Sequence, residues 1–201
     1  MAKAAAADWT LIERFRQGDR AAFDELVLRY SEQVYKLARN LTGHREDAED
    51  AAQEAFVRVY RSLSRFRGAS SFSTWLYRVV VNVCTDEMKH RSRRAVPASS
   101  LGGGDPEDIA ARVPAEASAS RRTDPLHELE RSQRDQVVRK AIKSLPQRLR
   151  AVIALCDMQG LSYEEAAAVL GMRMGTVKSR LHRARTALRD ALEPYRELLL
   201  A

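Results

Sequence analysis

The sequence predicts an all-α protein with two small helical domains joined by a flexible linker, the C-terminal one a four-helix domain. Apolar residues recur at spacings of three and four along most of the chain, and no segment alternates well enough to form a strand. The chain has 201 residues, 45% of them apolar, which suffices for two small cores. Residues 95–120 are mostly Ala, Ser, Gly and Pro. We therefore expect domains at residues 8–94 and 123–192, with residues 95–122 as the linker.

Four helices are expected in the N-terminal domain. The first covers Asp8–Gln17 with an apolar stripe that includes Trp9, and Gly18 ends it. Asp19 can cap a second helix that runs to Gly43. A third helix covers about residues 45–66 and a fourth about residues 71–91. The core stripe of the fourth helix consists of Phe72, Trp75, Leu76, Val79, Val80 and Val83.

The C-terminal domain opens with Asp124-Pro125, a cap followed by proline at the first helical position. Pro146 starts a second helix, which ends at Gly160. Ser162 and Glu165 then have the spacing of a capping box. Gly171 can take the positive φ of a tight turn before a last helix over residues 173–189. These last two helices predict a helix-turn-helix.

The last helix of this pair carries six Arg or Lys residues and no acidic residue. Its apolar residues fall on one face, so the opposite face is cationic; they are Val177, Leu181, Ala184 and Leu188. In a helix-turn-helix, side chains in the first half of the second helix read the major groove. The alternative is a solvated basic helix beside an accidental turn, although ordinary exposed helices mix both signs of charge.

The third helix has an uneven charge distribution. Residues 46–54 hold five acidic residues and no basic one, and basic residues follow. Acidic residues first and basic residues last suit the helix dipole, which explains part of the pattern. On an otherwise basic protein, an acidic helix start also fits a docking face for a protein partner.

Aromatic, hydroxylic and basic side chains gather around the start of the fourth helix. A rigid ring beside cationic groups can hold an unstacked base, and an Asn amide such as that of Asn82 can read a base edge. Core packing is the alternative for these aromatic residues, Trp75 included. Basic residues at the end of the helix, among them Lys89 and Arg91, suit phosphates.

The net charge of +7 favours a polyanionic partner, and on charge alone a membrane surface stays open. No run approaches the roughly 18 apolar residues of a spanning helix. Residues 1–7 lack the pattern of an export signal, so we expect a cytoplasmic protein.

The sequence shows no catalytic or metal-binding pattern. Cys84 and Cys156 stand far apart, each in a predicted helix, which favours two buried free thiols. The four histidines lack metal-ligand spacing, so neither structural zinc nor another cofactor is expected. A nucleophile elbow and a phosphate-cradling glycine loop are also missing from the sequence, which disfavours an enzyme.

Taken together, these motifs resemble an extracytoplasmic-function sigma factor of bacterial RNA polymerase. The resemblance covers nearly the whole chain outside the linker and the termini. It rests on residues 47–56 (DAEDAAQEAF), Phe66-Arg67-Gly68, residues 72–78 (FSTWLYR) with Asn82, Leu145-Pro146, residues 160–166 (GLSYEEA) and residues 175–180 (GTVKSR).

The resemblance implies one surface for core polymerase and one for each of two promoter elements. The acidic helix would dock on the clamp helices of the largest polymerase subunit, and a second contact would be the flap of the second-largest subunit. The core-binding residues would be Asp47, Asp50, Gln53, Glu54, Phe56 and Arg58. The −10 element would be opened and held by Phe66, Arg67, Trp75, Arg78, Asn82, Lys89 and Arg91. The −35 duplex would be read by Arg173, Thr176, Lys178, Ser179, Arg180, His182 and Arg183.

The function expected on this basis is to direct core RNA polymerase to specific promoters, with an anti-sigma factor as regulator and a monomeric free form. The competing hypothesis is a stand-alone repressor or activator that uses only the C-terminal helix-turn-helix. Such a regulator would bind its operator alone and as a dimer.

Overall fold

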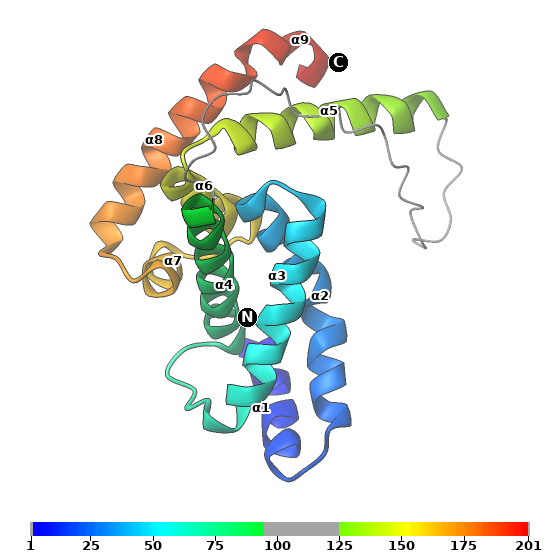
Figure 1. Ribbon diagram of the computed structural model, residues 1–201, viewed down its shortest axis with the longest axis vertical. Coiled ribbons are helices and arrows are strands. Elements are labelled where there is room, and N and C mark those ends of the chain that lie inside the picture. Colours follow the sequence, from blue (N-terminus) through cyan, green and yellow to red (C-terminus); the bar gives the residue numbers. More distant parts are fainter. Residues whose placement is uncertain (1, 95–124, 201) are drawn as a thin grey trace.

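The computed structural model describes residues 2–94 and 125–200, and all their regular elements are helices (Figure 1). The N-terminal half contains α1 (Ala2–Arg16), α2 (Ala21–Thr42), α3 (Arg45–Ser62), the 3-10 helix η1 (Leu63–Arg65) and α4 (Phe72–Arg94). The C-terminal half contains α5 (Pro125–Ser144), α6 (Gln147–Ile153), the π-helical turn η2 (Ala154–Met158), α7 (Tyr163–Leu170), α8 (Met174–Leu192), the 3-10 helix η3 (Glu193–Tyr195) and α9 (Arg196–Leu200). The all-α prediction is confirmed. The predicted linker, residues 95–122, lies outside the described residues.

Local signals in the sequence explain where several helices start and stop. The capping box of α7 is present: Ser162 Oγ accepts a hydrogen bond from Glu165 N–H, and the Glu165 carboxylate accepts one from Ser162 N–H. Gly171, with φ 62°, ends this helix in the left-handed conformation. α1 begins at Ala2, earlier than predicted, because the alanines before Asp8 favour helix.

Asp19, predicted to cap α2, lies one residue before the N-cap position of that helix. Arg20, which is itself in the helical region, precedes α2, and its side chain makes no cap. The Asp19 carboxylate instead accepts a hydrogen bond from Ala21 N–H at 3.0 Å. It also accepts one from Arg14 Nε at 2.9 Å, and this bond is the main reason that the pKa of Asp19 is lowered.

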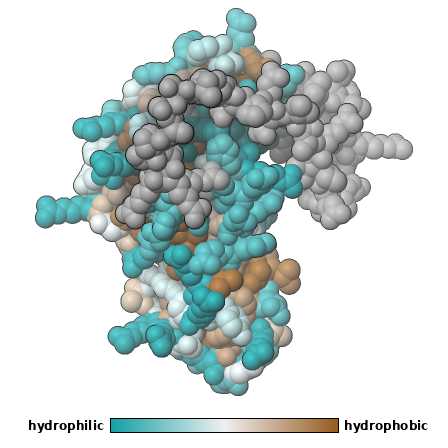
Figure 2. Space-filling model, viewed as in Figure 1, coloured by the Kyte–Doolittle hydropathy of each residue, from teal (hydrophilic) through white to brown (hydrophobic). Residues whose placement is uncertain are grey.

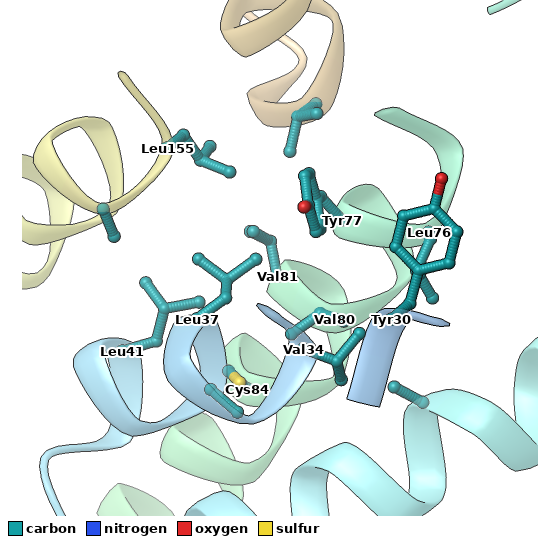
Figure 3. Close-up of a cluster of buried hydrophobic side chains, with 14 of the residues drawn as sticks. Tyr30, Val34, Leu37, Leu41, Leu76, Tyr77, Val80, Val81, Cys84 and Leu155 are labelled. Carbon is teal, nitrogen blue, oxygen red and sulfur yellow. The ribbon is translucent and has the colours of Figure 1, made fainter. Parts of the chain in front are cut away.

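One continuous apolar core joins the two halves. In the N-terminal half α1, α3 and α4 all pack on α2, whose buried side chains include Val34, Leu37 and Leu41. Figure 3 shows Leu155 of the C-terminal half close to Leu37, Leu41 and Val81. Tyr77, in the first half of α4, is also buried in this cluster.

The interface between the halves contains a buried guanidinium. The Arg150 side chain, on α6, is 8% exposed and donates hydrogen bonds to the carbonyls of Lys143 (2.5 Å) and Leu145 (3.0 Å) at the end of α5. A third bond, 3.0 Å long, goes to the carbonyl of Leu41 in the last turn of α2. Because the carboxyl ends of helices carry partial negative charge, this arginine stabilises two helix ends at once and links the two halves.

The helix-turn-helix rests on the N-terminal half through α7, which packs against α4 (Figure 1). Arg78 of α4 donates a hydrogen bond to the carbonyl of Ala168 on α7, with a distance of 2.5 Å. The first part of α5 projects away from the rest of the molecule in Figure 1, whereas its last turns pack on α8 and α2. The described chain is therefore closed, with its two halves in direct contact.

The two cysteines are free, as predicted, but only Cys84 is fully buried, and Cys156 is half-buried. Burial raises the pKa of the Cys84 thiol to about 12. Over the coloured part of the face in Figure 2, hydrophilic side chains predominate and apolar residues form smaller patches. Among the described residues, no helix combines the length and apolar character needed to cross a membrane.

Candidate nucleic-acid and polymerase interfaces

The helix α8 has one buried face and one cationic exposed face. Val177, Leu181 and Ala184 are buried, which leaves the opposite face to solvent. Arg173 stands in the extended N-cap position without a side-chain cap bond. Of the residues predicted to read the −35 duplex, Thr176 and Arg180 are half-buried, and Arg173, Lys178, Ser179, His182 and Arg183 are exposed. The structure brings these exposed groups together at the first half of the helix.

Neighbouring elements hold α8 in place. Arg185 binds the Asp157 carboxylate through two hydrogen bonds, of 3.0 and 2.6 Å, and this raises the pKa of the guanidinium. Asp157 lies in the π-helical turn, which the sequence analysis did not predict. Nζ of Lys178 lies 5.7 Å from the ring centre of Tyr163 on α7. These contacts connect α8 to α7 and to the π-helical turn before it.

The acidic start of α3 is exposed. Asp50 and Gln53 face solvent, whereas Asp47, Glu54 and Phe56 are half-buried. Arg58 binds Glu54 at 2.7 Å and Asp86 of α4 at 3.4 Å, so part of the acidic charge is neutralised within the protein. Exposed ion pairs of this kind contribute little stability, and their groups can exchange partners.

Four aromatic rings meet beside the loop between η1 and α4. Phe66 lies 5.1 Å from Trp75 and 6.1 Å from both Phe72 and Trp9, measured between ring centres. Phe66 is only 6% exposed. Sequence reasoning treated it as a stacking platform for a base, but the structure places its ring in the floor of this cluster, where only a small part is accessible. Trp75 is half-buried and packs on Phe66 and Phe72.

A cavity of about 450 Å³ opens between this loop and α1. Its α1 wall consists of Asp8, Trp9 and Ile12, and its loop wall consists of residues 66–68 and 70–72. The cavity thus combines aromatic surface with hydroxyl, carboxylate and guanidinium groups. Arg67 is exposed at the loop, and Ser70 and Ser71 are half-buried.

α1 is held against α2 and against the loop by polar contacts that the sequence did not reveal. Asp8 is buried and accepts hydrogen bonds from Tyr30 Oη and from Arg29, each at 2.5 Å. Burial, reinforced by this bond to Asp8, raises the pKa of Tyr30. Arg16 donates a hydrogen bond to the Phe66 carbonyl, 50 residues away in sequence. The sequence offered one signal for these contacts. Trp9 and Arg16 are seven residues apart, which places them on one face of the first helix.

The remaining residues predicted for the −10 element lie along α4. Asn82 and Lys89 are exposed, and the side chain of Arg91 lies outside the described residues. Arg78 is exposed and donates one of its five N–H groups to α7, so the closed chain uses part of its hydrogen-bonding capacity. Among the described residues, no three His, Cys, Asp or Glu side chains form a group able to hold a metal ion.

Two family sequence profiles match separate parts of the chain. The family sequence profile of Sigma-70 region 2 matches residues 26–94, and that of Sigma-70, region 4 matches residues 135–188. The chain is 38% identical to the RNA polymerase sigma-H factor of Pseudomonas aeruginosa over 93% of its own length and 94% of that protein. It is 37% identical to the ECF RNA polymerase sigma-E factor of Escherichia coli strain K12, over 93% and 95% of the two chains.

A solved structure supports the same fold. It is the structure of CnrH in complex with the cytosolic domain of CnrY. Its matched chain has a TM-score of 0.64 and 25% sequence identity, with 94% of this chain and 98% of that chain covered.

Proposed function

This chain belongs to the extracytoplasmic-function family of RNA polymerase sigma factors, and on that premise we propose how its surfaces divide the work of promoter recognition. The protein is a sigma factor that binds core RNA polymerase, directs it to promoters, reads the −35 duplex and captures the opened −10 element. It acts as a regulatory subunit, and we assign it no catalytic residue and no cofactor. We place its action in the cytoplasm, with core polymerase and promoter DNA.

The exposed acidic part of α3 is the proposed contact with the clamp helices of the largest polymerase subunit. Asp50 and Gln53 are accessible in the closed chain, and Glu54 becomes available when Arg58 changes partner. Because an acidic surface is repelled by DNA, this surface suits a protein partner, and the basic surfaces of the same molecule can bind the promoter. The C-terminal half is proposed to contact the flap of the second-largest subunit.

Two separate surfaces are proposed for DNA. The exposed first half of α8 would enter the major groove of the −35 element, with Arg183 and Lys178 among its basic side chains. The loop after η1 and the exposed side of α4 would hold the separated −10 strand, with Asn82 reading a base edge. The observation that carries this proposal is that one chain has two separate exposed surfaces, the cationic first half of α8 and the aromatic loop before α4.

The closed arrangement fits a resting form of the protein. Arg78 donates one N–H to the Ala168 carbonyl, and separation of α7 from α4 would make all its donors available to promoter phosphates. The matched CnrH structure contains a second protein, the cytosolic domain of CnrY. We propose that an anti-sigma factor stabilises the closed form of this sigma factor away from the polymerase. A stand-alone regulator is not favoured, because it would leave the acidic α3 surface and the −10 surface without a role.

Two substitutions test whether the two DNA surfaces have separate roles. Both are measured on a promoter that the wild-type holoenzyme transcribes. Arg183→Ala is expected to weaken binding to −35 duplex by about 1–3 kcal/mol and to relax its sequence preference, without affecting strand opening. Asn82→Ala is expected to reduce open-complex formation about tenfold and to leave −35 binding unchanged, since one base-edge contact is lost. Duplex binding is measured by fluorescence anisotropy and strand opening by permanganate reactivity.

The matched control is Arg189→Ala, because Arg189 is exposed near the far end of the same helix and pairs with Asp190. It should behave as wild type in both assays. If Arg183→Ala weakens every −35 variant equally, Arg183 binds phosphate and does not read sequence. Unchanged open-complex formation by Asn82→Ala would remove Asn82 from the −10 surface.

A further inference from the structure

The cavity between α1 and the loop has an exposed tryptophan in its wall. Trp9 is 41% exposed, whereas the two phenylalanines that line the same cavity, Phe66 and Phe72, are buried. Leaving so much of an indole in water costs free energy that core packing would recover. Its exposed ring is therefore surface available to a flat ligand.

The indole is fixed in orientation from several sides. Its ring centre lies 6.1 Å from that of Phe66, and Cζ of Arg16 lies 5.3 Å from the indole centre. Gly68 has φ +70°, and a Cβ built on it would lie 2.9 Å from Cζ3 of Trp9. The loop can approach the ring this closely only because residue 68 has no side chain. A ring held in this way loses little entropy when a ligand stacks on it.

The other groups around the cavity suit a nucleobase attached to a phosphate chain. Aromatic surface provides the stacking contact, and the exposed Arg67 guanidinium at the loop suits a phosphate. The Ser70 hydroxyl makes one long hydrogen bond, 3.3 Å, to the Ser71 carbonyl, so it retains capacity for a base edge. The cavity volume of about 450 Å³ exceeds what a single base needs.

We propose that Trp9 of α1 is a base-stacking residue, and that it forms with the loop the pocket for one unpaired base of single-stranded DNA. This proposal rests on the assigned sigma function and adds to it a helix that none of the proposed DNA surfaces includes. Arg16 is a positioning residue, because it bonds the Phe66 carbonyl and lies over the indole. The N-terminal helix thereby contributes directly to holding the separated strand.

The test uses the full chain and fluorescein-labelled single strands of poly(dA), poly(dC) and poly(dT). An abasic strand with the same phosphates serves as the electrostatic control. Trp9→Leu keeps an apolar side chain beside Gly68 but removes the stacking ring. It is expected to weaken binding to at least one base-containing strand by about fivefold or more, and to leave binding to the abasic strand unchanged.

Tryptophan emission gives a readout that a packing role would not change. The chain has two tryptophans, Trp9 and Trp75. Binding of a base-containing strand should quench wild-type emission, and Trp9→Phe should remove most of the quenching while it retains most of the affinity. Emission should not change with the abasic strand.

Three results would overturn the proposal: wild-type affinity in Trp9→Leu, quenching that is undiminished in Trp9→Phe, or wild-type protein that binds no base-containing strand more tightly than the abasic one. The sigma function itself is judged separately, by transcription with core polymerase. Promoter-specific transcription by wild type together with any of these results would reject the Trp9 pocket alone.

Discussion

Arg150→Ala is expected to lower the free energy of unfolding by about 3 kcal/mol. The substitution removes a buried charged donor and leaves the carbonyls of Leu41, Lys143 and Leu145 without their partner in an apolar interface. Hydrogen bonds from charged groups contribute about 1.5–3 kcal/mol, and the buried acceptors add a desolvation cost. Urea denaturation of the full chain, followed by circular dichroism, measures the change.

Two controls separate the hydrogen bonds of Arg150 from its charge. Arg148→Ala removes the same charge from an exposed position on the same helix and should change stability by less than about 0.5 kcal/mol. Arg150→Lys keeps the charge but cannot reach three carbonyls in different directions, so its loss should be intermediate. If Arg150→Ala is no less stable than Arg148→Ala, the guanidinium does not join the two halves in solution.

Gly68→Ala should have the second largest effect on stability, because alanine is strained at this backbone conformation and its Cβ would collide with a neighbouring ring. An alanine at φ +70° costs about 1–2 kcal/mol, and its Cβ would lie 2.9 Å from the Trp9 ring. The loop must move away from α1, which opens the cavity. We expect a loss of stability of about 2–4 kcal/mol, combining the strain with the cost of overpacking, and a clear loss of affinity for single-stranded DNA.

Gly160→Ala is the matched control for Gly68→Ala. Gly160 has nearly the same φ, +69°, but a Cβ there would meet nothing within 4 Å. It should lose only the cost of strain, about 1–2 kcal/mol, and should bind single strands as wild type does. Equal stability losses in the two variants would mean that the loop does not close on Trp9.

Local chemistry in the sequence predicts most of the individual helices. The capping box of Ser162 and Glu165 and the left-handed Gly171 depend on neighbouring residues only, so the helix-turn-helix is readable without a structure. The buried stripe of α8 follows from spacing for the same reason, although Leu188 is only partly buried. Even so, the π-helical turn was missed, because one extra residue in a turn leaves no clear periodic signature.

Contacts between distant segments could not be predicted from the sequence. The Arg150 bond to Leu41 spans 109 residues, and one partner is a backbone carbonyl that any residue would supply. Trp9 looked like one member of an apolar stripe, and only the approach of Gly68 reveals that it lines a cavity. The burial of Phe66 has the same origin, since the rings that cover it come from α1 and α4.

The central claim is that this one chain gives core RNA polymerase its promoter specificity, through a duplex-reading helix and a separate site for an unpaired base. Single-round transcription with purified bacterial core polymerase tests it most directly. The account predicts discrete promoter-dependent transcripts only when core enzyme and this protein are both present, with weak promoter binding by the protein alone. Absence of such transcripts, together with protection of a palindromic site by the protein alone, would contradict it.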